Sequence, residues 1–261
     1  MKSSISASGT AGKRPPGRER TSTCVMPLCQ QASRLGHEQQ RPGFCGKCLV
    51  GDAQVEVALA AGLPRACEWA LKMGTDTVSC FAFDRDDTAP IHSTDVPELV
   101  IQRLSEMADI TAAHGCRLAL ENEAGCWGAT GLEAAHICRA VGADRLSLLW
   151  DPGNSCMAGS RAPLEEYAEL KDLVSHVHCK NFVEPGDWSL METGVVDWPA
   201  QVRALEQDGY DGFLVIETHL HIRPDAFAVA DVAVDRNLGL EQNSEANLRF
   251  LNDKCLRGAR L

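Results

Sequence analysis

From about residue 76 to its C-terminus, the chain alternates regularly between short apolar runs and helical patterns. Apolar runs of this length predict strands, and the periodic segments between them predict helices. Strands are expected over residues 77–83, 117–122, 146–151, 174–180 and 213–218, and helices over 97–114, 132–141, 163–171, 198–208 and 243–254. Such an alternation implies a parallel sheet with right-handed crossovers and helices packed on it.

Side chains that can bind a metal lie at the ends of four successive predicted strands. Glu121, Asp151 and Glu217 end their strands, and His178 lies near the end of another. In a barrel of βα units, the carboxyl ends of the strands carry the active site. Three carboxylates and one imidazole suit a divalent cation such as Mn²⁺, Mg²⁺, Co²⁺ or Zn²⁺.

The N-terminal part of the chain does not continue this pattern. An eight-stranded barrel takes about 250 residues, but residues 1–75 offer at most one more βα unit, near 53–74. There, residues 53–59 alternate weakly and 66–74 form a helical pattern. We therefore expect an α/β fold of the (β/α) TIM-barrel type over residues 51–261, incomplete or altered at its N-terminus. An open strand edge would favour a homo-oligomer.

The charge of the chain is divided unevenly. Residues 1–50 hold eight basic and two acidic residues, whereas the remainder holds 17 basic and 34 acidic residues. An acidic body is unsuited to phosphate backbones, so nucleic acid is not an expected partner. No apolar run reaches the roughly 18 residues of a membrane span, and we expect a cytoplasmic protein. The basic, acid-poor beginning leaves an organelle transit peptide open.

The twelve cysteines form two groups. Eight are scattered through predicted strands, helices and loops, as is typical of free thiols in a reducing compartment. The other four have the spacing C-x₄-C-x₁₅-C-x₂-C, which resembles a paired-knuckle zinc pattern; they are Cys24, Cys29, Cys45 and Cys48. They either bind a structural Zn²⁺ or are incidental thiols of a disordered basic leader spanning residues 1–50.

Five segments together resemble the sugar-phosphate isomerase/epimerase family, which has a xylose isomerase-like barrel. They are Leu118-Ala-Leu-Glu-Asn122, Asp151-Pro-Gly-Asn154, His176-Val-His-Cys-Lys-Asn181, Gly194-Val-Val-Asp-Trp198 and Gly209-Tyr-Asp-Gly-Phe-Leu-Val-Ile-Glu-Thr-His219. Each segment is a weak signal, but their order and spacing are fairly specific. The resemblance extends from about residue 66 to the C-terminus.

The resemblance implies roles for individual residues. The family's metal ligands correspond to Glu121, Asp151, His178 and Glu217. His178 is preferred over His176 because it fits the family's His-x-Lys-Asp pattern and lies nearer the strand tip. Lys180 matches a substrate-contacting lysine, and Asn154 is a second substrate-binding candidate. The chain departs from the family at Asn181, where Asp is frequent, and at Asn154, where some members have a histidine.

The residues around these ligands receive secondary roles in our interpretation. His176 is assigned to the core, while Glu123 and His219 are assigned to the periphery of the site. Trp188 is interpreted as a packing residue, and Asp197 as the N-cap of the helix that follows it.

The resemblance implies a metal-dependent isomerase or epimerase of a small sugar, sugar phosphate or hydroxy-keto acid, and hence carbohydrate metabolism. Such reactions remove a proton beside a carbonyl, and a metal stabilises the enediolate. Glu121 and Glu217 would be the catalytic proton-transfer groups. Three alternatives stay open: a lyase (dehydratase) with the same site, a repair nuclease like AP endonuclease, and a non-catalytic barrel with a zinc-binding, partner-recruiting N-terminus.

Overall fold

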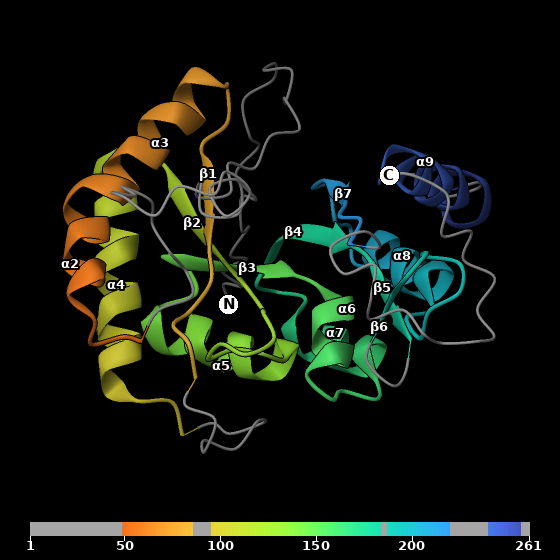
Figure 1. The fold of residues 1–261 in the computed structure, drawn as a ribbon, viewed down its shortest axis with the longest axis horizontal. Coiled ribbons are helices and arrows are strands. Elements are labelled where there is room, and N and C mark those ends of the chain that lie inside the picture. Colours follow the sequence, from red (N-terminus) through yellow and green to blue (C-terminus); the bar gives the residue numbers. More distant parts are fainter. Residues whose placement is uncertain (1–48, 86–94, 184–186, 220–239, 257–261) are drawn as a thin grey trace, which may run out of the picture.

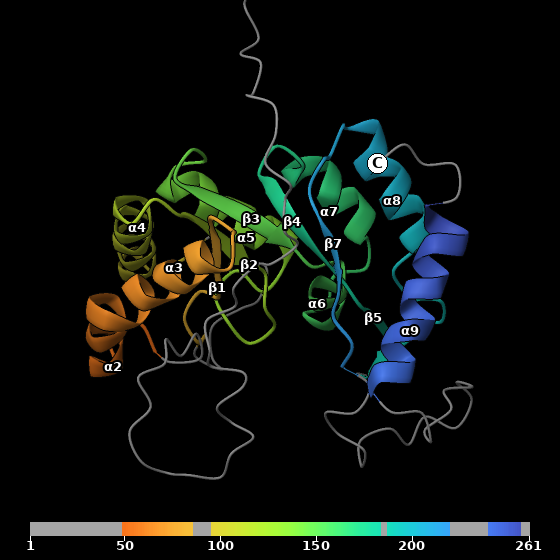
Figure 2. The same ribbon diagram turned by 90° about the horizontal axis from the view of Figure 1, so that it is seen from above.

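The computed structural model describes residues 49–85, 95–183, 187–219 and 240–256. Its main sheet has five parallel strands in the order β1-β2-β3-β4-β7. The strands are β1 (Thr77–Cys80), β2 (Arg117–Glu121), β3 (Leu146–Trp150), β4 (Val174–Cys179) and β7 (Leu214–Ile216). The sheet curls into a partial barrel (Figures 1 and 2). The predicted α/β, incompletely closed barrel is confirmed.

Helices pack against this sheet in chain order. Those between and after the strands are α4 (Glu98–Ala113), α5 (Gly131–Val141), α6 (Pro152–Met157), α7 (Pro163–Leu170), α8 (Trp198–Gln207) and α9 (Leu240–Phe250), which continues into η2 (Leu251–Cys255). α4 packs on β2, α5 on β2 and β3, and α9 on β7. The Asp197 side chain accepts a hydrogen bond from the Ala200 amide at 2.9 Å, which confirms the predicted N-cap of α8.

Residues 53–72 are helical throughout, so the strand of the further βα unit predicted near 53–74 is wrong, whereas the helix predicted over 66–74 is present. They form α2 (Ala53–Val57), η1 (Ala58–Gly62) and α3 (Leu63–Lys72). Val55, Leu59 and Leu63 are buried at helical spacing, and this period prevails over the weak alternation because it gives the segment one apolar face. In the described residues, the parallel sheet therefore begins at β1.

The connection between β4 and α8 contains a small hairpin. β5 (Asn181–Val183) and β6 (Asp187–Ser189) pair in antiparallel fashion, with Phe182 opposite Trp188. The two rings meet edge to face at 6.5 Å between centroids. The hairpin carries Trp188 back toward the end of β4, where the candidate site lies.

The core lies between the sheet and its covering helices. Trp150 and Trp198 are fully buried there, together with leucines of β2 and β3. Among the described residues, no helix has the length and apolarity that crossing a bilayer requires. The predicted leader lies outside the described residues up to residue 48, and so do Cys24, Cys29, Cys45 and Cys48.

Candidate metal centre and active site

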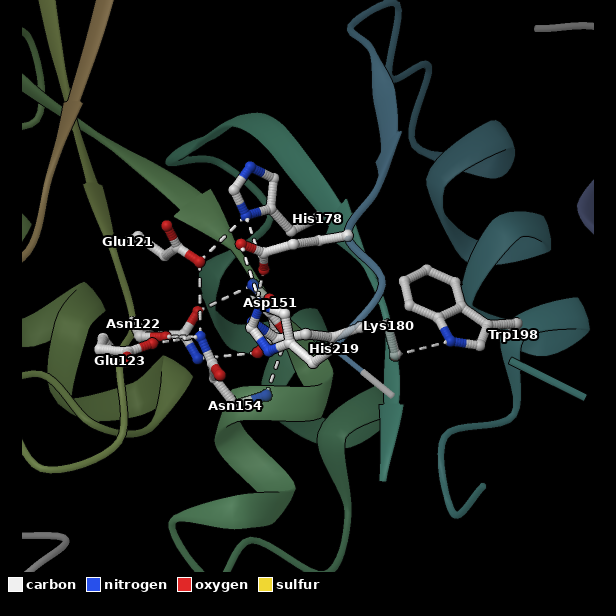
Figure 3. A network of polar contacts seen from close by, with 10 residues as sticks. Glu121, Asn122, Glu123, Asp151, Asn154, His178, Lys180, Trp198 and His219 are labelled. Carbon is white, nitrogen blue, oxygen red and sulfur yellow. Dashed lines mark hydrogen bonds and ion pairs between the residues drawn. The ribbon is translucent and has the colours of Figure 1, made fainter. Parts of the chain in front are cut away.

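Four predicted ligands meet at the carboxyl ends of four neighbouring strands. Glu121 is the last residue of β2, Asp151 follows β3, His178 lies in β4 and Glu217 follows β7. One ligand atom from each lies within 4.8 Å of the other three. Figure 3 shows Glu121, Asp151 and His178 pointing toward a common centre. Strands far apart in sequence are brought together because parallel strands place their carboxyl ends at one edge.

Two basic side chains, His178 and Lys180, lie between the three carboxylates. His178 Nδ1 lies 3.0 Å from Glu121 Oε1 and 3.5 Å from Glu217 Oε2. Lys180 Nζ lies 3.0 Å from Asp151 Oδ2 and 2.5 Å from Glu217 Oε2. All of these side chains are almost completely buried except that of Glu217, which is 15% exposed. We call Glu121, Asp151 and Glu217 the carboxylate cluster.

The donor atoms of the carboxylate cluster fit a divalent cation. Within the described residues, Glu121 Oε2 is buried and has no hydrogen-bond partner, and Asp151 Oδ2 accepts no hydrogen bond of acceptable geometry although Lys180 lies nearby. A buried carboxylate oxygen without a donor is costly unless a cation coordinates it. Three carboxylates and an imidazole within a few ångströms are a donor set that Mn²⁺, Mg²⁺, Co²⁺ or Zn²⁺ would accept.

Asn122 fixes Asp151 in place, a role that the sequence analysis missed. Its Nδ2 donates to the carbonyl oxygen of Asp151 at 2.8 Å, and its Oδ1 accepts from the Asp151 amide at 2.8 Å. Asp151 Oδ1 accepts from the Asn154 amide at 2.9 Å and caps α6. Capping uses one oxygen and leaves Oδ2 facing the cluster, so Asp151 acts both as a helix cap and as a candidate ligand.

Asn154 connects the ends of β2 and β3. Its Nδ2 lies 2.9 Å from Glu123 Oε2, 2.9 Å from the Asn122 carbonyl oxygen and 3.4 Å from Glu121 Oε1. The side chain is therefore anchored by protein acceptors, and its contact with a substrate stays a prediction. Glu123, predicted to be peripheral, borders the site through this bond.

Trp188 belongs to the site, beyond the packing role that we predicted for it. Lys180 Nζ lies 4.9 Å from the centroid of the indole, within reach of a cation–π contact. The His219 ring meets the same indole edge to face at 4.9 Å, and His219 Nε2 lies 3.4 Å from Glu217 Oε1. The position of Trp188 depends on the β5–β6 hairpin, which gave no clear sequence signal.

Asn181 has a structural role that explains its departure from the family's frequent Asp. Its Oδ1 accepts from the amides of Phe182 and Val196, each at 2.9 Å. Its Nδ2 donates to the carbonyl oxygens of Met191 and Val196, at 2.8 and 3.0 Å. These two donors are what an amide has and a carboxylate lacks. Asn181 therefore holds the loop that leads to α8.

Burial shifts the pKa values of the site residues. Burial raises the pKa of Glu121 to about 7, although His178 acts to lower it. Burial also acts to raise the pKa of Glu217, but Lys180 and His178 hold that pKa well below its usual range. His176 is buried behind the site, and burial lowers its pKa to about 4. A neutral His176 agrees with its predicted core position.

A family model described as "Xylose isomerase-like TIM barrel" matches residues 46–253. The chain belongs to this family. The match covers the whole sheet and all four candidate ligands. It agrees with the resemblance carried by the strand-end motifs, and it extends that resemblance to the helical segment before β1.

Two curated relatives of this xylose isomerase-like chain match part of it. The rhizopine catabolism protein MocC of Rhizobium meliloti is 28% identical over 134 residues, which cover 44% of this chain and 41% of MocC. An inosose dehydratase of Lacticaseibacillus casei is 22% identical over 149 residues, which cover 50% of each protein. The chain thus spans about half the length, or less, of these relatives.

Solved structures show the same fold. The IOLI protein, crystallised with a zinc atom, has a TM-score of 0.64 and 16% identity over 80% of this chain and 73% of that chain. The 3-keto-D-glucoside 4-epimerase YcjR of E. coli has a TM-score of 0.56 and 18% identity over 78% of this chain and 75% of that chain. At these identities, the likeness establishes the fold alone.

Proposed function

We propose that this protein is a metal-dependent enzyme that moves a proton beside the carbonyl of a small sugar, sugar phosphate or hydroxy-keto acid. The observation that carries the proposal is the convergence of Glu121, Asp151, His178 and Glu217 within 4.8 Å at the carboxyl edge of the sheet. Our preferred version of this reaction is an isomerisation or epimerisation. The dehydratase relative supports a lyase about as well, since both begin with the same proton removal.

The proposed roles follow from where each side chain lies. All four would hold the metal, which supplies a Lewis acid that stabilises negative charge on substrate oxygens. Glu121 and Glu217 both contact His178 Nδ1 but come from strands β2 and β7. They therefore approach the centre from different sides and are our candidates for proton transfer. Lys180 and Trp188 border the same centre.

Two other functions have less support. A three-metal nuclease site needs further histidines, and the group around Glu121 is the only cluster of at least three candidate ligands found among the described residues. A non-catalytic, partner-recruiting barrel would not need four metal-facing side chains packed together. Its zinc-binding part, Cys24 to Cys48, lies outside the described residues.

Solvent-proton exchange over a panel of candidate substrates tests the proposal. The full chain, loaded with Mn²⁺, is incubated in D₂O with ketoses, their phosphates and hydroxy-keto acids, and deuterium at the carbon beside the carbonyl is followed by NMR. We expect exchange with at least one compound, and its loss in Glu217→Gln and Glu121→Gln. Glu245→Gln is the matched control, because Glu245 is exposed and pairs only with Arg249 in the contacts described.

The products separate the two forms of the reaction. When the reaction is repeated in H₂O, an isomer or epimer has the mass of its substrate, whereas a lyase product is lighter by one water, which mass spectrometry detects. Exchange that survives in both glutamine variants would contradict the assigned roles. A chain that binds no Mn²⁺ above the level of a Glu217→Gln, His178→Ala double variant would contradict the metal site itself.

A further inference from the structure

Lys180 occupies the position of a cation within the carboxylate cluster. Its ammonium contacts Asp151 Oδ2 and Glu217 Oε2, at 3.0 and 2.5 Å. Asp151 Oδ1 accepts a hydrogen bond from the Asn154 amide, and Glu217 Oε1 faces His219. A metal held by Asp151 and Glu217 would therefore coordinate the other two oxygens, which are the ones that Lys180 contacts. One lysine thus covers an available oxygen of two of the four candidate ligands.

The packing around Lys180 fixes the position of its side chain. Its side chain is 3% exposed, and its carbonyl oxygen accepts a hydrogen bond from Trp198 Nε1 at 3.0 Å. A Cβ atom at Gly153 would lie 2.9 Å from Lys180 Cγ, so the glycine leaves room for the stem. Its ammonium also lies over the Trp188 ring. Because packing already orders the side chain, the ion pairs form with little further loss of entropy.

The charges around the cluster make this lysine necessary in the metal-free protein. Three buried carboxylates repel one another. Among the described residues, the basic side chains in contact with them are Lys180, His178 and His219, and Lys180 alone of these is a permanent cation. The contact with Asp151 is an ion pair without the geometry of a hydrogen bond. Such a contact holds mainly by charge, so a competing cation can replace it.

We propose that the Lys180 ammonium is a built-in counter-cation of the carboxylate cluster, which competes with the divalent metal for Asp151 and Glu217. The inference rests on the metal site of the proposed function. A metal and an ammonium repel each other and need the same oxygen lone pairs. Lys180 therefore stabilises the metal-free protein and weakens metal binding, and metal loading frees its ammonium for other acceptors in the pocket.

Metal titration of Lys180 variants tests this proposal. The full chain, Lys180→Met and Lys180→Gln are stripped with EDTA and titrated with Mn²⁺ by calorimetry. Mn²⁺ is chosen because carboxylates bind it and the cysteine thiols prefer softer metals. We expect both variants to bind Mn²⁺ about tenfold more tightly than wild type, since the competing charge is gone. Lys171→Met is the matched control, because Lys171 is half exposed and pairs with Asp208.

Thermal unfolding supplies a second readout that does not depend on activity. In EDTA, Lys180→Met should unfold at a lower temperature than wild type, and Mn²⁺ should raise its unfolding temperature by more than that of wild type. If the variants fold only with Mn²⁺, as followed by circular dichroism, the counter-cation role is supported. If Mn²⁺ does not restore folding, the role is overturned.

The outcomes separate this inference from the proposed function. Wild type that binds Mn²⁺ while both Lys180 variants bind it equally or more weakly overturns the counter-cation and leaves the metal site standing. Wild type that binds no more Mn²⁺ than the Glu217→Gln, His178→Ala double variant overturns the proposed metal site and the inference with it.

Discussion

At the scale of single residues, the site is set by side chains that hold the candidate ligands as much as by the ligands. Asn122 joins the backbone of Asp151 through two hydrogen bonds, across 29 residues of sequence. The two hydrogen bonds extend the connection between β2 and β3 beyond the last paired residues of the strands. It fixes the separation of Glu121 and Asp151, so its loss would affect both folding and metal binding.

Asn122→Ala tests this role. The substitution removes the hydrogen-bond partner of the buried Asp151 amide, while the Asp151 carbonyl oxygen keeps the Ser155 amide at 3.2 Å. We therefore expect a loss of about 1–3 kcal/mol in the free energy of unfolding. Urea unfolding in EDTA measures that loss, and Mn²⁺ titration should show weaker binding than wild type. Asn252→Ala, at an exposed position, should change neither quantity. An unchanged Mn²⁺ affinity in Asn122→Ala would show that Asn122 does not position the ligand.

At the scale of elements, α5 packs closely against Trp150, the last residue of β3, next to Asp151. Gly131, the first residue of α5, faces the Trp150 ring, and an added Cβ would lie 2.3 Å from Cζ3 of that ring. The same Cβ would lie 2.6 Å from Leu170 Cδ2 of α7. Glycine is thus required here for space, since its backbone does not have a positive φ.

Gly131→Ala should be destabilising even though alanine favours helices. Alanine gains at most about 1 kcal/mol from helix propensity, whereas overpacking a core typically costs about 1–3 kcal/mol. We expect the clash with the buried Trp150 ring to dominate, and urea unfolding measures the net loss. Gly51→Ala serves as the control, because nothing lies within 4 Å of its added Cβ. Equal stabilities of the two variants would argue against the tight contact.

At the scale of the whole molecule, the candidate metal centre links four of the five parallel strands. The described sheet ends at β1 on one side and at β7 on the other, and β7 has only three residues. Glu217 connects this short strand to β2, β3 and β4 through His178 and Lys180. A metal bound to all four residues would therefore tie the edge strand to the centre of the sheet.

Metal removal should accordingly lower the stability of the entire sheet. A ligand that binds only the folded state at about 100 times its Kd contributes about 2.7 kcal/mol. We expect a gain of this order on adding Mn²⁺ to the EDTA-treated protein, measured by thermal and urea unfolding. The Glu217→Gln, His178→Ala double variant should show no gain. A gain of the same size in that variant would place the stabilising metal elsewhere.

Much of this fold could be anticipated from short-range patterns. The five parallel strands, the helices between them and the cap at Asp197 depend on residues close in sequence, so apolar period and turn chemistry were sufficient. The same patterns gave a wrong prediction at residues 53–59, where the weak alternation of a strand competed with apolar residues at helical spacing. They also missed α6 and the β5–β6 hairpin, because elements of three to six residues leave little periodic signal.

The sequence alone determines that four candidate ligands lie at strand ends: Glu121, Asp151, His178 and Glu217. Parallel strands bring their carboxyl ends to one edge of the sheet whatever their side chains are. Their partners are a matter of tertiary structure. Lys180 meets Glu217 across 37 residues, and Trp188 reaches Lys180 only because the chain turns back after β5. Contacts of this kind depend on distances between elements and on packing at sites such as Gly153. No local sequence pattern specifies these distances, because they arise between segments far apart in the chain.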